Sequence, residues 1–197
     1  MPPKTRITKT MILNTVLEIT QETGFETVNA RSIAGKLQCS TRPVFTCYEN
    51  MEELKKEFLD FAFEYYTQYV EIYGKSKKVE PCLLLPLSYI TFAKDETNLF
   101  KLLFISDIDL DMTAAEDFYK EIGNAKKAKT FSDMIGVDPE RAKEIFLDLF
   151  LYSHGIAVLT ATGKMSLDSY NTEKMLLNFL SAFMQPKKKN KKGRCSE

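Results

Sequence analysis

The chain has 197 residues with 27 basic and 27 acidic side chains, and its hydrophobic content of 44% is sufficient for a packed core. Tryptophan is absent, glycine is sparse, and the prolines other than Pro86 lie near expected helix boundaries or termini, which favours an all-helical protein. The N-terminus MPPKTRITK lacks the apolar core of a signal peptide, and no apolar run reaches the length of a membrane span, so we expect a cytoplasmic protein without membrane contact.

Cysteine and histidine usage argues against metal and cofactor chemistry. The four cysteines show no CxxC pairing, and His154 is the single histidine. Neither a glycine-rich phosphate loop nor a nucleophile beside a base is visible, so we expect no metal, no cofactor, no catalytic residue and no enzyme activity. Cys39 and Cys47 flank a short helix described below; they could form a thiol switch, and burial as small apolar side chains is the alternative.

Charge is distributed unevenly along the chain. Residues 1–50 carry six basic and four acidic side chains, and residues 187–197 carry six and one. The segment 51–186 carries fifteen basic and twenty-two acidic side chains. A basic N-terminal part on an acidic body is typical of a protein that presents one end to a polyanion.

The N-terminal fifty residues predict three helices. A first helix capped by Thr8 should run to about Thr23, where Gly24 can take a left-handed conformation. Asn29 should cap a second helix, with Arg31 exposed in its first turn. Ahead of both lies a short basic stretch that could reach a phosphate backbone or be a frayed terminus, and its charged side chains are Lys4, Arg6 and Lys9.

A three-residue break, Gln38 to Ser40, separates the second helix from a third short one. Ser40 is a suitable N-cap, and Pro43 lies in the first turn, where a missing amide proton costs little. Apolar residues face inward on both helices, and the polar side chains of the third helix face outward. This layout is typical of a helix-turn-helix, and an ordinary corner between two core helices is the alternative. The outward side chains are Thr41, Arg42, Thr46 and Glu49.

The remaining sequence predicts a bundle of helices. Asn50 should cap a long helix to about residue 73, long enough to leave the N-terminal module and enter a second one. A further helix should begin at Pro81, with a kink at Pro86, and the next should include residues 99–104. A capping box at Thr113–Glu116 should start another helix, and the helical stretch after it should end at Gly136. The last two helices should run from Asp138 to Gly163 and from Ser166 or Asp168 onward. The expected domains are 1–50, 51–185 and a basic, disordered tail, 186–197.

Over residues 8 to about 58 the chain resembles the tetracycline-repressor (TetR) family of bacterial transcription regulators. The stretch GFETVNARSIAGKLQCSTRPVFTCYENMEEL follows the family pattern of first helix, helix-turn-helix and opening of the fourth helix. The rest matches only as a helical bundle of suitable length, including the His154–Gly155 pair. The resemblance implies a homodimer that places two recognition helices in successive major grooves of double-stranded DNA and holds a small ligand in its C-terminal bundle.

The resemblance also assigns site residues, with three departures from the family pattern. Gln38 replaces a glycine common in the turn, at a cost of roughly 1–2 kcal/mol if the left-handed conformation is kept. Phe45 replaces a tyrosine that commonly donates to phosphate, and Met51 replaces a lysine. Lys55, Lys56 or the N-terminal arm could compensate. The expected DNA-binding residues are Arg31, Ser40, Thr41, Arg42, Phe45, Thr46, Lys4 and Arg6.

Aromatic side chains of the bundle are candidates for holding an apolar or aromatic ligand, with plain core packing as the alternative for each. His154 could instead lie at a dimer seam or be a hydrogen-bonded core residue. The last two long helices carry more apolar surface than a monomer should expose, so we expect a homodimer through them. The candidate ligand residues are Tyr65, Tyr69, Tyr89, Phe92, Phe100, Phe104, Phe118, Phe150 and His154.

The sequence therefore predicts a ligand-responsive, sequence-specific DNA-binding regulator, expected to be a repressor acting as a homodimer on a palindromic operator. The rival hypothesis is a helical protein-interaction module on the same fold that has lost DNA binding. Salt-sensitive binding to duplex DNA separates the two, since each neutralised phosphate steepens the dependence of affinity on ionic strength.

Overall fold

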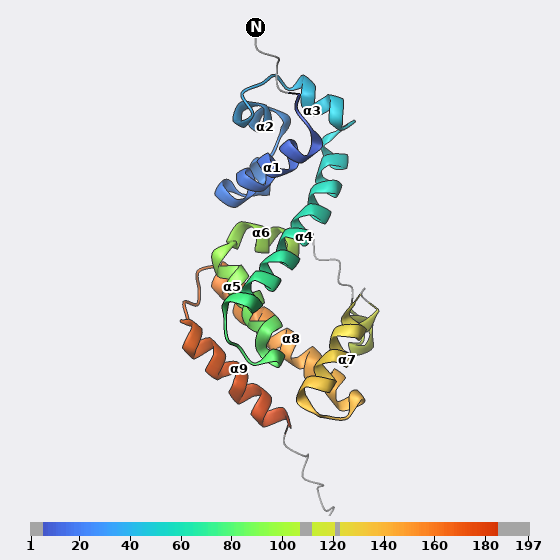
Figure 1. Cartoon of the computed structure of the whole chain (residues 1–197), viewed down its shortest axis with the longest axis vertical. Helices are drawn as coiled ribbons and strands as arrows, with labels where there is room; N and C mark the ends of the chain where they lie inside the picture. The colour runs from blue at the N-terminus through green and yellow to red at the C-terminus, as the bar shows by residue number, and fades with distance from the viewer. Residues whose placement is uncertain (1–5, 107–111, 121–122, 185–197) are drawn as a thin grey trace, which may run out of the picture.

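The computed structural model describes residues 6–106, 112–120 and 123–184, which form helices and the connectors between them, with no strand among these residues. Figure 1 shows the N-terminal helices joined by a long helix to a larger group of helices. The predicted all-helical class is confirmed. In chain order the elements are α1 Lys9–Thr23, η1 Phe25–Thr27, α2 Ala30–Lys36, α3 Arg42–Cys47, α4 Met51–Ser76, η2 Pro81–Leu83, α5 Leu84–Asp95, α6 Thr97–Lys101, η3 Leu102–Ser106, η4 Ala115–Tyr119, α7 Asn124–Ile135, α8 Pro139–Ala161 and α9 Ser169–Met184.

The first helix begins and ends where its sequence predicts. The Thr8 hydroxyl accepts a hydrogen bond from the Met11 amide at 3.2 Å. At the C-terminal end Gly24 has φ +93° and ψ 153°, which is an extended positive-φ conformation rather than the predicted left-handed helical one. A side chain at this positive φ would strain the backbone, so the position favours glycine.

The corner between α2 and α3 differs from the prediction in its length. Asn29 caps α2 by accepting from the Arg31 and Ser32 amides, as expected. The connector spans residues 37–41, because α3 begins at Arg42 with Thr41 in the N-cap position and no side-chain cap. The prediction that Ser40 caps α3 is therefore wrong. Gln38 does adopt the left-handed conformation, with φ +52°.

The long helix α4 has 26 residues and is about 39 Å long, ending three residues beyond the predicted position. Asn50 accepts from the Glu53 amide at 2.9 Å, and the Glu53 carboxylate accepts from the Glu49 amide at 2.7 Å. Its buried residues recur every four positions, at Leu54, Phe58 and Ala62, all fully buried. This stripe belongs to one apolar core that continues from α1 through α4 to α9.

The larger group of helices is built around α5 and α8, which pack along each other. Pro86 is the third residue of α5, where its missing amide proton breaks no helical bond, so the predicted kink is wrong. Helix α8 is long and apolar enough to cross a membrane by length and composition, and 44% of that window is buried inside the protein. It packs against α5, α7 and α9, as expected of a core helix.

Two caps in this part agree with the sequence and one does not. The Asp138 carboxylate accepts from the Glu140 and Arg141 amides at the start of α8, and the Asp168 carboxylate accepts from the Asn171 amide at the start of α9. The predicted capping box at Thr113–Glu116 is wrong: the carboxylate of Asp117 accepts from the Thr113 and Ala114 amides and starts only the short η4. The predicted connector at 106–112 and the tail 186–197 lie largely or wholly outside the described residues.

Candidate functional site

Helix α3 presents a mixed apolar and cationic face to solvent. Val44 and Tyr48, 1% and 2% exposed, anchor its inner side in the core. The side chains of Arg42, Phe45 and Thr46 are exposed, and 52% of the Phe45 surface is accessible. The Thr46 hydroxyl donates to the Arg42 carbonyl at 2.9 Å, which orients it along the helix. Of the four side chains predicted to face outward, Arg42, Thr46 and Glu49 are exposed, whereas Thr41 is half-buried.

The other predicted DNA-binding residues are distributed around α3. Thr41 is half-buried at the N-cap, and Ser40 is exposed in the connector before it. Arg6 and Arg31 are exposed, and within the described part of the chain neither they nor Arg42 makes an ion pair. Lys4 lies outside the described residues. Three arginines therefore have their charges available, one just ahead of α1 and two on α2 and α3.

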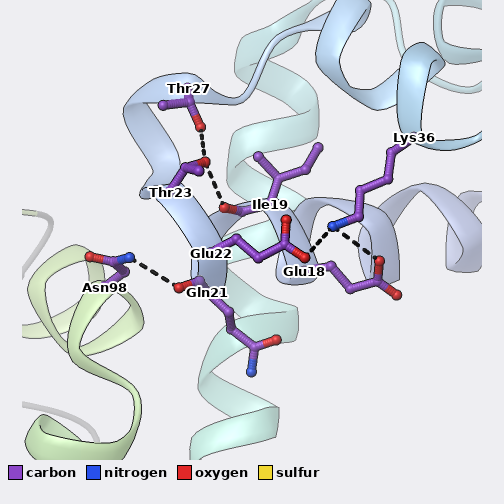
Figure 2. Close-up of polar contacts among 8 residues, drawn as sticks. All are labelled: Glu18, Ile19, Gln21, Glu22, Thr23, Thr27, Lys36 and Asn98. Atoms are coloured by element: carbon purple, nitrogen blue, oxygen red, sulfur yellow. Dashed lines mark hydrogen bonds and ion pairs between the residues drawn. The ribbon is translucent and has the colours of Figure 1, made fainter.

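The two lysines of these helices are engaged in ion pairs. Lys9 Nζ lies 2.6 Å from Oε2 of Glu57 on α4. Lys36 Nζ lies 2.6 Å from Oε1 of Glu22 and 3.4 Å from Oε2 of Glu18, which ties α2 to α1 (Figure 2). These carboxylates raise the pKa of both lysines, so both remain charged. These ion pairs hold α1 against α4 and α2 against α1.

The predicted ligand residues, with one exception, form a single connected network of aromatic rings. Its centre is Tyr89 on α5, whose ring centroid lies 5.0 Å from Phe104 and 5.2 Å from Phe100. Tyr69 joins through Phe92 at 5.1 Å. We call this set the aromatic network, and its predicted members are Tyr69, Tyr89, Phe92, Phe100, Phe104, Phe118, Phe150 and His154.

Sequence reasoning missed Tyr66, which belongs to the same network. Its ring centroid lies 4.9 Å from Phe92 and 5.0 Å from Phe104. Burial raises its pKa, and within the described residues its hydroxyl has no hydrogen-bond partner. The four-residue step that places Phe58 and Ala62 in the core continues to Tyr66, and this periodicity was the signal that could have identified it.

His154 on α8 is held by the network rather than exposed. Its Nδ1 lies 2.9 Å from the Tyr89 hydroxyl, and its ring lies 5.8 Å from that of Phe150. Burial lowers the pKa of the imidazole and raises that of Tyr89, so both side chains are neutral near pH 7. A neutral pair inside a cluster of rings can accept or donate one directional hydrogen bond in an otherwise apolar site.

Tyr65 is the exception, because it lies outside this network. Its hydroxyl donates to Oε1 of Glu96 at 2.7 Å and lies 3.3 Å from Nε2 of Gln21. Burial and the neighbouring carboxylate raise the pKa of Tyr65 to about 12. It therefore joins helices at the boundary between the N-terminal helices and the bundle.

The outer face of α8 and α9 carries exposed apolar side chains. On α8, Leu151 and Leu159 are 52% and 41% exposed and flank Gly155 at steps of four residues. A Cβ at Gly155 would meet nothing within 4 Å. On α9, Tyr170 and Leu177 are 72% and 40% exposed. These side chains on α8 and α9 remain exposed within the described chain.

Among the described residues no group of three or more histidine, cysteine or acidic side chains is arranged to hold a metal ion. In comparisons with known proteins, no protein-family model matches the chain, and no curated protein matches it.

Proposed function

We propose that the chain is a DNA-binding transcriptional regulator whose helices α2 and α3 form a helix-turn-helix, with α3 as the recognition helix. The observation that carries this proposal is the exposed face of α3, where Arg42 has no ion pair with any described residue while the inner side of the helix is fully buried. An arginine presented this way can bind guanine O6 and N7 in a bidentate manner, and threonine hydroxyls can contact several bases.

The neighbouring arginines support contact with the phosphate backbone. Arg6 and Arg31 are exposed on the same small group of helices, and neither is neutralised by a described carboxylate. Lys9 and Lys36 are occupied by glutamates, so they contribute less. Phe45 can pack against sugar and phosphate edges but cannot donate a hydrogen bond. We therefore expect anchoring by few phosphate contacts.

The exposed face of α8 and α9 supports a homodimer. An exposed row of Leu151, Gly155 and Leu159 allows two helices to approach closely at the glycine, and Leu177 lies on the adjoining helix. A two-fold dimer would place two copies of α3 on one face of duplex DNA, which requires a palindromic site. We expect repression as the outcome, through occupation of an operator.

The aromatic network supports control by a small apolar or aromatic ligand. Its rings come from α4, α5, α6, η3, η4 and α8, and the His154–Tyr89 pair supplies one polar contact. Such a ligand shifts the protein between states only if it binds one of them more tightly. A ligand that reorders these rings would act on α4, which continues directly into the N-terminal helices.

The rival function is a protein-interaction module, and the exposed Phe45 favours it, because an accessible phenylalanine suits an apolar partner. Titration of the full chain with duplex DNA at several salt concentrations decides between the two. The DNA-binding proposal predicts that the logarithm of affinity falls linearly with the logarithm of salt concentration. Binding that does not change with salt, or no binding at low salt, would refute it.

A further inference from the structure

One residue of α1 is held by the bundle through both its side chain and its backbone. The Gln21 side-chain amide donates to both carboxylate oxygens of Glu96, at 2.9 and 3.0 Å. The side-chain amide of Asn98 donates to the Gln21 carbonyl at 3.1 Å (Figure 2). Glu96 and Asn98 lie at the start of α6, so this short helix binds the C-terminal half of α1 at two points.

The same carboxylate is also bound by α4. Tyr65 donates to Glu96 at 2.7 Å, and its raised pKa of about 12 keeps the phenol protonated near neutral pH. All four side chains are half-buried, where hydrogen bonds to a carboxylate are stronger than in bulk water. We call Gln21, Tyr65, Glu96 and Asn98 the polar joint, because α1, α4 and α6 meet there.

The other end of α6 belongs to the aromatic network. Phe100 lies two residues beyond Asn98 and packs 5.2 Å from Tyr89. Phe104 follows in η3, a π-helical turn, and lies 5.0 Å from both Tyr66 and Tyr89. A π-helical turn can revert to an α-helical one by a shift of one residue, and such turns recur at functional sites. Repacking of Phe104 would therefore move α6 and the polar joint together.

A neighbouring face of α1 holds α2. Glu18 and Glu22, on the same helical turns as Gln21, bind Lys36 at the end of α2 (Figure 2). Because α2 is tied to α1 and precedes the corner with α3, a displacement of α1 displaces both. The contacts thus run from the aromatic network through α6, the polar joint and α1 to α2.

We propose that the polar joint couples the state of the aromatic network to the position of α2 and α3 through α1, in addition to the direct path along α4. The coupling requires the hydrogen bonds of the Gln21 side chain, since among the described residues no other side chain of α1 hydrogen-bonds to Glu96. What the coupling regulates rests on the proposed function, whereas the coupling itself is a property of the free chain.

Hydrogen exchange of the full chain, without DNA or ligand, tests the proposal by a double-mutant cycle. Phe104→Leu perturbs the network while keeping an apolar side chain. Gln21→Leu removes the side-chain amide that donates to Glu96 and leaves a side chain of similar size. In the natural background Phe104→Leu should speed amide exchange in residues 19–28 by about threefold to tenfold. In the Gln21→Leu background the same substitution should change that exchange by less than about twofold. Exchange in α9 serves as the reference for global stability.

Lys36→Met is the matched control, because it removes a polar tie of α1 that faces α2 instead of α6. It should speed exchange in α2 and leave the effect of Phe104→Leu on residues 19–28 unchanged. An effect of Phe104→Leu that is equal with and without Gln21, or absent in both, overturns the proposal. Because no DNA is present, that result leaves the proposed function standing, and a chain that binds no DNA leaves the coupling result standing.

Discussion

Gln38 is the one non-glycine residue with positive φ in the described part of the chain, at +52°. Its amide donates to the Gly35 carbonyl at 3.2 Å, and the following Cys39 amide donates to the Ala34 carbonyl at 2.9 Å. The corner before α3 therefore keeps a glycine-like conformation although a side chain is present. A side chain at such a position strains the backbone by roughly 1–2 kcal/mol.

Gln38→Gly should consequently stabilise the protein. Relief of the left-handed strain exceeds the entropy that glycine adds to the unfolded chain, so we expect the free energy of unfolding to rise by about 0.5–1 kcal/mol. Chemical denaturation measures the change. Gln38→Ala is the control, because it keeps the Cβ and should bring no such gain; equal gains from both substitutions would contradict the explanation.

His154 predicts how stability depends on pH. Burial lowers its pKa in the folded state below the ordinary value of 6.5, so the unfolded chain binds more protons below about pH 6.5. Stability from this group should be complete above pH 6.5 and decrease as the pH falls below it. Thermal unfolding from pH 5 to 8 should show this slope, and His154→Gln should flatten it. An unchanged slope in the variant would mean that a group other than His154 causes the pH dependence.

At the scale of single elements, the sequence predicted helix starts wherever a cap acts locally. The caps at Thr8, Asn29, Asn50, Asp138 and Asp168 each accept from an amide two or three residues ahead, as the pattern requires. The aromatic network was also largely predictable, because large apolar residues at helical spacing face the core. Both kinds of inference depend on neighbours in sequence.

The predictions that failed depend on contacts between distant residues. Helix α3 begins at Arg42 and not directly after Ser40 as predicted. Packing of Val44 and Tyr48 decides where the helix lies, and no side chain caps it. Tyr65 was predicted among the ligand residues but lies outside the aromatic network, because its hydroxyl donates to Glu96, thirty-one positions away. The polar joint could not be predicted for the same reason, because no local pattern places Gln21 beside α6.

For α3 as an element, two arginines should behave differently. Arg42→Ala should cost about 1–3 kcal/mol of binding free energy and relax preference at one base position. Arg31→Ala should weaken binding evenly across sequences and reduce the salt slope by about one. Competition binding with single-base operator variants compares them. An Arg42→Ala protein with unaltered affinity and base preference would remove α3 from the interface.

At the scale of the whole molecule, the α8–α9 face predicts the oligomeric state. Gly155→Leu adds a side chain that meets nothing inside the chain and would block close approach of a second α8. The variant should therefore fold and be a monomer of 22.6 kDa, whereas the natural chain should have about twice that mass. Sedimentation measures both. Gly35→Leu, at an exposed helical glycine of α2, is the control and should remain dimeric; a dimeric Gly155→Leu would contradict this interface.

The charge distribution favours one orientation of the molecule toward a polyanion. The acidic segment 51–186 contains the bundle, whereas Arg31 lies on α2 and Arg42 on α3, the helices at the far end from the bundle in Figure 1. A polyanion is therefore attracted to one end and repelled by the other, which favours approach with α3 in front.

Selection of bound duplexes from a random pool tests the central claim most directly. If α3 reads DNA in a two-fold dimer, the selected sequences should converge on a palindrome whose half-sites lie about one helical repeat apart, roughly 34–36 Å. The same selection with Arg42→Ala should lose the preference at one position in each half-site. A pool that stays random with the natural chain would contradict the claim that this exposed helix recognises DNA.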